Sequence, residues 1–260
     1  MERLRLIRRS FADDPELGTA VSRAILHRVA AGELPATARV HLPAREVAFG
    51  RQDVVSEGYP AAARAAREAG FAPIERMAGG RAAIFHQGTV AIARAYPDPD
   101  PPRRTYQRFE EMAGMVAAAL ARLGIDPRVG EVPGEYCPGA YSVSARGERK
   151  LAGIGQRMIR GGAHVGVVVV ASGADEIRRV LVPVYEALGL DWEPGTAGSA
   201  SEELGREVAA EELADALVAE LDRRYELEQA EVDEPTLELA RRLLAEQRSE
   251  GARGRPGAAP

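Results

Sequence analysis

Three observations in the sequence predict an α+β fold with a helical C-terminal extension. Short strand-like runs and amphipathic helical patterns both recur before residue 190. Residues 164–170, HVGVVVV, form a nearly continuous β-branched run, which is typical of a fully buried strand. Residues 199–247 are charged and helical in spacing, with leucines on one stripe. Separate runs of strands and helices favour an α+β domain.

The N-terminal part of the chain supplies strands and two helices. Asp13-Asp14-Pro15-Glu16 predicts a helix start, because Asp caps a helix, Pro fits its first turn, and an acid suits the positive end of the dipole. A second helix is alanine-rich and ends before Gly70. We expect helices at 15–29 and 59–68, and strands at 4–7, 38–42, 46–49, 82–85 and 89–93.

The central part of the chain predicts a helix at 105–123, a hairpin, the buried strand and a further helix at 174–188. In the hairpin, a strand at 142–145 turns at Gly147-Glu148 and returns at 151–155. We divide the chain into a catalytic domain at 1–195, a helical extension at 196–248, and a tail at 249–260. The tail is rich in Gly, Pro and Ala, which predicts disorder.

Composition excludes several classes of protein. With 260 residues, a net charge of −5 and one cysteine, the chain has neither the basic balance of a nucleic-acid binder nor a possible internal disulfide. No apolar stretch is long enough to span a membrane, and the N-terminus lacks the apolar core of a secretory signal. The four histidines show no metal-ligand spacing. We therefore expect a cytoplasmic protein that binds no metal, membrane or nucleic acid.

The only cysteine, Cys137, lies in the segment EYCPGAY, just before the predicted hairpin. That hairpin would return Lys150 towards the thiol. A nearby cation lowers the pKa of a thiol from its usual value of about 8.5, and the thiolate is the nucleophilic form. The pair indicates nucleophilic catalysis, although the two residues alone also allow a buried structural cysteine and a solvated lysine.

Residues 76–93 form a second informative segment. Gly79 and Gly80 come before the strand at 82–85, and a turn at 86–88 separates that strand from the next. Adjacent glycines let another group approach the backbone closely, which suits a ligand site, although most glycine pairs are ordinary turns.

Three blocks of the sequence resemble the biotin/lipoate protein ligase superfamily over roughly residues 12–190. They are Gly50-Arg51-Gln52-Asp53, Arg76-x-x-Gly79-Gly80-x-Ala82 and Lys150-x-x-Gly153-x-x-Gln156-Arg157. Within the superfamily, Tyr136-Cys137-Pro138-Gly139-x-Tyr141 followed by the lysine block is most similar to the octanoyl-[H protein]:protein octanoyltransferases, also called lipoyl amidotransferases.

The resemblance implies a mixed sheet flanked by helices and a two-step transfer of an octanoyl or lipoyl group. Cys137 would accept the acyl group as a thioester from the glycine cleavage H protein, or from acyl carrier protein, and a lysine of a lipoyl domain would then receive it. Lys150 would lower the pKa of the thiol and polarise the carbonyl. The resemblance implies no cofactor. It implies a substrate-binding set of Arg76, Gly79, Gly80, Ala82, His86, Gly88, Gly153 and Gln156.

Two other hypotheses stay open. In an ATP-dependent lipoate or biotin ligase, Lys150 would hold an acyl-adenylate and Cys137 would be incidental. Arg81, His86 and Ala91 differ from the residues that are common in the family, which is compatible with a non-catalytic relative that binds acyl groups or proteins. Ser142 also stands where an aspartate is frequent.

Overall fold

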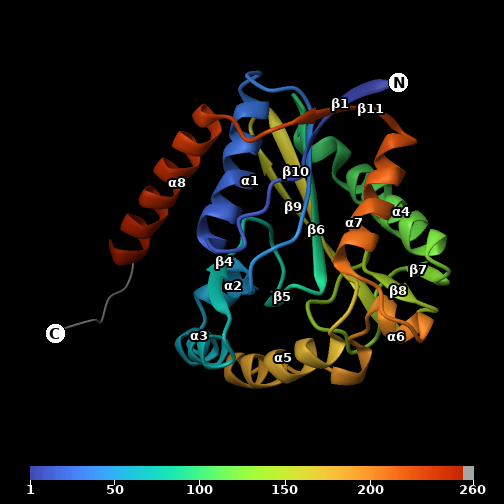
Figure 1. Ribbon diagram of the computed structural model, residues 1–260. Coiled ribbons are helices and arrows are strands. Elements are labelled where there is room, and N and C mark those ends of the chain that lie inside the picture. The colour runs from blue at the N-terminus through green and yellow to red at the C-terminus, as the bar shows by residue number, and fades with distance from the viewer. Residues whose placement is uncertain (254–260) are drawn as a thin grey trace.

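The computed structural model describes residues 1–253, with side chains to residue 249 (Figure 1). Its strands are β1 (Glu2–Ile7), β2 (Thr37–His41), β3 (Glu46–Phe49), β4 (Ala72–Glu75), β5 (Ala83–Phe85), β6 (Thr89–Pro97), β7 (Pro127–Val129), β8 (Val143–Ala145), β9 (Arg149–Ile159), β10 (Gly162–Val170) and β11 (Tyr225–Ala230). Its α-helices are α1 (Pro15–Ala30), α2 (Arg51–Val54), α3 (Tyr59–Glu68), α4 (Thr105–Arg122), α5 (Ala174–Leu188), α6 (Ala200–Leu204), α7 (Ala210–Asp222) and α8 (Glu234–Arg253). Two 3₁₀ turns occur, at Pro101–Arg104 and Pro194–Thr196.

These strands form two sheets. The larger has the order β11-β1-β2-β6-β10-β9-β8-β7, and the smaller has the order β4-β3-β5. In the larger sheet, β1 is parallel to both of its neighbours, and the other pairs are antiparallel. The predicted α+β class with a mixed sheet is confirmed.

Helices cover both faces of the larger sheet (Figure 1). On one face, α1 packs against β6 and β10 and is itself covered by α8. On the other face, α4 and α7 pack together against the sheet. The smaller sheet lies at one end, where α3 and α5 share a third hydrophobic cluster with it. The cavity described below lies between α1, the large sheet and β3.

Most predicted elements are confirmed, including the helix at 59–68 and the hairpin formed by β8 and β9. Sequence reasoning missed α2, β4 and β7, which have four residues or fewer and therefore show too little periodicity to detect. Within residues 1–253, no helix has the length and apolar character needed to cross a membrane.

The prediction of helix throughout residues 199–247 is wrong at Tyr225–Ala230. This segment, YELEQA, is β11, and it pairs in parallel with β1 from Glu2 to Ile7. Its two glutamates and its place between two charged helical segments hid a strand, whose backbone groups pair with a segment from the other end of the chain. Residues of α7, such as Leu213 and Leu217, share one core with β1 and β2, so the 196–248 segment is packed into the same unit as the preceding residues.

The C-terminal prediction of disorder from residue 249 also needs correction, because α8 continues to Arg253. Residues 254–260 of the predicted tail lie outside the described residues.

Candidate active site

Cys137 lies in the loop between β7 and β8 and has a left-handed backbone conformation. Its φ angle is 44°, in the left-handed region that costs a non-glycine residue roughly 1–3 kcal/mol. The backbone N–H of Cys137 donates to the Tyr185 hydroxyl at 2.8 Å, and that hydroxyl donates to the Ala82 carbonyl at 2.8 Å. A buried tyrosine of α5 therefore holds the cysteine backbone to the start of β5.

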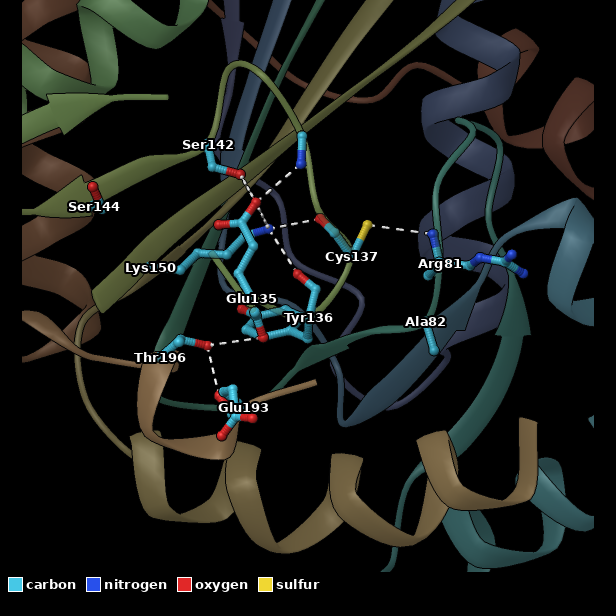
Figure 2. A network of polar contacts seen from close by, with 12 residues as sticks. Arg81, Ala82, Glu135, Tyr136, Cys137, Ser142, Ser144, Lys150, Glu193 and Thr196 are labelled. Atoms are coloured by element: carbon cyan, nitrogen blue, oxygen red, sulfur yellow. Dashed lines mark hydrogen bonds and ion pairs between the residues drawn. The ribbon is translucent and has the colours of Figure 1, made fainter. Parts of the chain in front are cut away.

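The thiol receives hydrogen bonds from the glycine-pair segment. Arg76 Nη2 lies 3.2 Å from Cys137 Sγ, and the backbone N–H of Arg81 lies 3.3 Å from it; Figure 2 shows the Arg81 contact. Burial raises the pKa of the Cys137 thiol, but the charges of Arg76 and Lys150 and these two hydrogen bonds outweigh it, so the pKa falls below its usual value. The geometry favours a thiolate.

Lys150 approaches Cys137 as the hairpin predicts, but its amine does not bind the sulfur. Lys150 Nζ donates to the carbonyls of Tyr136 at 2.9 Å and Cys137 at 2.8 Å, and it lies 3.3 Å from Glu135 Oε1 (Figure 2). An ammonium has three donors, and these partners occupy all three. Burial lowers the pKa of Lys150, and the nearby Cys137 and Glu135 oppose that shift only in part.

Glu135, which sequence reasoning did not assign a role, closes the cysteine loop. Besides Lys150, its Oε1 accepts hydrogen bonds from Gly139 N at 2.9 Å and from Ser142 Oγ at 2.6 Å. Ser142, one of the departures from the family pattern, therefore lies at this carboxylate. The sequence signal for a role of Glu135 was an acid two residues before the only cysteine, and the structure shows that this acid is buried.

The three blocks that carried the resemblance meet at this thiol. Gly80 has φ 102°, and a Cβ there would lie 2.2 Å from Arg76 Nη2 and 2.9 Å from Cys137 Sγ. A Cβ at Gly50 would lie 1.7 Å from the Gly80 carbonyl oxygen. Only glycines fit this approach. Gly79 has open space at its Cβ position and is under no such steric constraint.

The side chain of Arg81 explains how that residue fits a position where the family commonly has a small one. Arg81 Nη1 lies 3.1 Å from Oδ1 of the fully buried Asp53. Asp53 also accepts a hydrogen bond from Gly50 N at 3.1 Å. The ion pair ties the Gly50–Asp53 block to the glycine pair and so fixes the N–H group that contacts the thiol.

A cavity of about 130 Å³ adjoins the site, between α1, β3 and the large sheet. Arg76, Met77 and Ala78 form one wall, next to the thiol. Gly153 lies at the same end, where an added Cβ would be 3.3 Å from Lys150 Cε. Most other lining residues are small or apolar, so the cavity suits a short hydrocarbon chain.

Of the predicted substrate-binding set, Arg76 and Gly153 line this cavity, and six residues do not: Gly79, Gly80, Ala82, His86, Gly88 and Gln156. Gln156 accepts a hydrogen bond from Arg108 and donates to the Thr105 carbonyl, on the face of β9 opposite Gly153 and Gly155, because successive strand residues alternate between faces. Ala82 acts through its carbonyl, as described above.

His86 and Gly88 form a turn instead of a binding surface. His86 is buried, and its Nδ1 accepts a hydrogen bond from Gly88 N at 3.0 Å. A Cβ at Gly88 would lie 2.6 Å from the Ser172 carbonyl oxygen, so packing against the chain itself requires this glycine. Within residues 1–253, no three His, Cys, Asp or Glu side chains are grouped as a metal site requires.

Comparisons with known proteins identify relatives over most of the chain. The family model described as lipoyl protein ligase A/B catalytic domain matches residues 14–222. An octanoyl-[GcvH]:protein N-octanoyltransferase of Geobacillus kaustophilus is 32% identical over 220 residues, which cover 81% of this chain and 75% of that protein. The enzyme of the same name from Bacillus velezensis is 29% identical over 226 residues, covering 82% and 76%.

Solved structures show the same fold. The crystal structure of lipoate-protein ligase A bound with ATP has a TM-score of 0.74 at 19% identity, covering 94% of this chain and 95% of that one. A putative lipoate protein ligase from T. acidophilum with bound lipoic acid has a TM-score of 0.73 at 18% identity, covering 95% and 96%. The resemblance stated from the sequence is confirmed: the chain belongs to the lipoyl protein ligase A/B catalytic domain family.

Proposed function

We propose that this protein is a cysteine-dependent acyltransferase, which moves an octanoyl or lipoyl group from a carrier protein to a lysine of a lipoyl domain through a thioester on Cys137. The observation that carries the proposal is the pair of hydrogen bonds to Sγ, from Arg76 and Arg81 N, beside a largely apolar cavity. Arg76 belongs to both features, since it contacts the sulfur and lines the cavity.

In the first step, the Cys137 thiolate attacks the carbonyl carbon of the acyl-lysine amide on the donor. The C–N bond breaks, the donor lysine leaves with one proton, and the acyl group stays on Sγ as a thioester. Arg76 stabilises the thiolate before attack. The charge of Lys150 lowers the pKa of the thiol, as the resemblance implied, but its donors are occupied by the Tyr136 and Cys137 carbonyls and by Glu135, so it holds the cysteine loop instead of polarising the acyl carbonyl.

In the second step, the amine of an acceptor lysine attacks the thioester carbonyl, loses one proton and restores the thiolate. The proton taken up by the donor lysine balances the one released by the acceptor. One amide replaces another, so the exchange needs no nucleotide and no metal.

The names of the most similar relatives support the choice of donor and of an octanoyl chain. The relatives from Geobacillus kaustophilus and Bacillus velezensis are both named for transfer from GcvH to protein. We therefore assign the glycine cleavage H protein as the donor and lipoyl domains of 2-oxoacid dehydrogenases as the acceptors. Acyl carrier protein is the alternative donor.

Intact mass of the protein after incubation with octanoyl-loaded H protein tests the thioester directly. We expect a mass increase of one octanoyl group that hydroxylamine removes, and none in the Cys137→Ala variant. Octanoyl-acyl carrier protein, run in parallel, identifies the preferred donor. Pyrophosphate release on addition of ATP and octanoate, with no adduct on Cys137, would instead support an ATP-dependent ligase in which Lys150 holds an acyl-adenylate.

A further inference from the structure

The cavity beside Cys137 has a floor of small residues that crosses four adjacent strands. Gly155 of β9 pairs with Gly166 of β10, Gly166 with Ala93 of β6, and Ala93 with Arg39 of β2. All four residues line the cavity. Because neighbouring strands are about 4.8 Å apart, this row extends roughly 14 Å from the Gly155 end, near Ala78, to Arg39. The cavity is therefore a channel that runs across the sheet.

Polar side chains line the part of this channel that lies away from the thiol. Arg39 and His41 come from β2, Glu46 comes from β3 and His164 comes from β10. The imidazole of His164 leans over the channel floor, with its Cε1 3.0 Å from the place where a Cβ at Gly166 would lie. A channel for an unsubstituted alkyl chain has no use for this cluster.

Several of these polar groups have no hydrogen-bond partner in the protein. His164 is 7% exposed, and both of its ring nitrogens are unpartnered, as is Nδ1 of His41. Glu46 is 8% exposed and makes no side-chain hydrogen bond. Arg39, in contrast, is held by the carbonyls of Arg9 and Gly18 and by Ser22 Oγ. Buried polar groups are nearly always hydrogen-bonded, so a ligand is expected here.

These free groups are uncharged near neutral pH. Burial lowers the pKa of His164 to about 4 and brings the pKa of His41 well below its usual value. Burial raises the pKa of Glu46 to about 8, against the opposing charge of Arg39. These three groups therefore offer neutral donors and acceptors beside the hydrogen-bonded guanidinium of Arg39, and they match an uncharged ligand group that both donates and accepts a hydrogen bond.

We infer that the acyl group carried by this protein is a medium-length chain whose distal part bears a neutral hydrogen-bonding substituent, such as a hydroxyl, held by His164, Glu46 and His41. The inference rests on the proposed acyl transfer and changes its preferred substrate from a plain octanoyl chain to one that is hydroxylated away from the carbonyl end. A plain octanoyl chain would displace water from these groups without replacing its hydrogen bonds, and sites built to bind a hydroxyl discriminate strongly against analogues that lack it.

The experiment compares two H-protein donors, one loaded with octanoyl and one with 8-hydroxyoctanoyl groups, by the rate at which an acyl mass appears on Cys137. We expect the hydroxylated donor to react about tenfold faster or more. A second measurement needs no transfer: 8-hydroxyoctanoate should protect Cys137 from iodoacetamide at a lower concentration than octanoate does.

Variants locate the effect. His164→Leu and, separately, His41→Leu should reduce the preference for the hydroxylated chain in both measurements, while His27→Leu, on α1 and outside the channel lining, should leave it unchanged. Glu46→Gln keeps the hydrogen-bonding capacity and should retain most of the preference, whereas Glu46→Leu should not.

The outcomes separate the two proposals. Rapid acylation by octanoyl donor, with equal or slower acylation by the hydroxylated donor, overturns the inference and leaves the proposed function standing. Absence of acylation from both donors overturns the proposed function, and the protection assay still decides the preference of the channel. Equal protection by the two acids, unchanged in His164→Leu, would mean that water alone occupies the polar groups.

Discussion

Two buried polar clusters, one beside Cys137 and one in the channel away from the thiol, differ in their hydrogen bonding. At the cysteine end, Lys150 and Glu135 are buried, and Lys150 is fully engaged by backbone carbonyls and by the carboxylate. At the far end of the channel, both ring nitrogens of the buried His164 and Nδ1 of His41 lack hydrogen-bond partners. We call the first the complete cluster, because all three donors of the Lys150 ammonium have partners, although Glu135 Oε2 has none. We call the second the incomplete cluster, because His164 has no partner at either ring nitrogen.

The difference separates two uses of buried polarity. The complete cluster makes the cysteine loop rigid, because each hydrogen bond of Lys150 and Glu135 fixes a group next to Sγ. The incomplete cluster lowers the stability of the fold, because each desolvated group without a partner costs about 1–3 kcal/mol. Hydrogen bonds to water or to a ligand in the channel would offset this cost. Under the proposed function, the first cluster would position the thiol, and the second is suited to selecting the acyl chain.

The largest effect is expected from removal of the nucleophile at the cysteine end. Cys137→Ala should slow octanoyl transfer to a lipoyl domain by about 10³-fold or more, because no thioester can form. Ser144→Ala, which alters a buried residue on the adjacent hairpin strand, should keep wild-type transfer rates. Retention of transfer in Cys137→Ala would show that the complete cluster serves another chemistry.

Breaking the complete cluster should destabilise the fold strongly. Lys150→Met leaves the buried Glu135 carboxylate without its cation, and removal of one partner from a buried pair costs about 3–5 kcal/mol. Urea denaturation measures the loss. Glu135→Gln in the same chain should recover part of it, because the unpaired charge is gone. A loss below about 1 kcal/mol in Lys150→Met would contradict the idea that this cluster fixes the loop.

The incomplete cluster should make stability depend on pH. The folded pKa of Glu46, about 8, is raised above its unfolded value of about 4.5, so its contribution is fully present below pH 4.5 and is lost as pH rises through 8. Between pH 6 and pH 8 this group should remove about 2 kcal/mol from the unfolding free energy of the wild type. Glu46→Gln should show a smaller decline over that interval, and an identical decline would exclude the shift.

The smallest expected effect lies in the thiol itself. Arg76→Gln removes the cation that contributes most to lowering the pKa of Cys137. The midpoint of the pH profile of iodoacetamide alkylation should therefore move up, and alkylation near neutral pH should slow. The assay reports on one site, because the chain has a single cysteine. Arg51→Gln, which alters an exposed ion pair with Glu75, is the matched control and should leave the profile in place.

The sequence predicted much of the site because its signals are local. The hairpin β8–β9 brings Lys150 back to Cys137, as the strand–turn–strand pattern indicated, and the blocks at Gly50, Gly80 and Cys137 do meet. Strand alternation puts Gly153 and Gln156 on opposite faces of β9, so the sequence pattern alone excludes Gln156 from the face that Gly153 occupies. The resemblance implied that His86 and Gly88 bind substrate, whereas their contacts belong to a turn.

The sequence by itself determined the fold class, the single cysteine and the nearness of one lysine, because these depend on composition, periodicity and short-range pairing. Only the tertiary structure decided that Arg76, 61 residues away in sequence, is the cation that contacts the sulfur, and that Lys150 donates to backbone carbonyls instead. It also decided that β11 completes the sheet and that His164, His41 and Glu46 share one channel. Contacts of this kind depend on how distant segments pack, which no local pattern encodes.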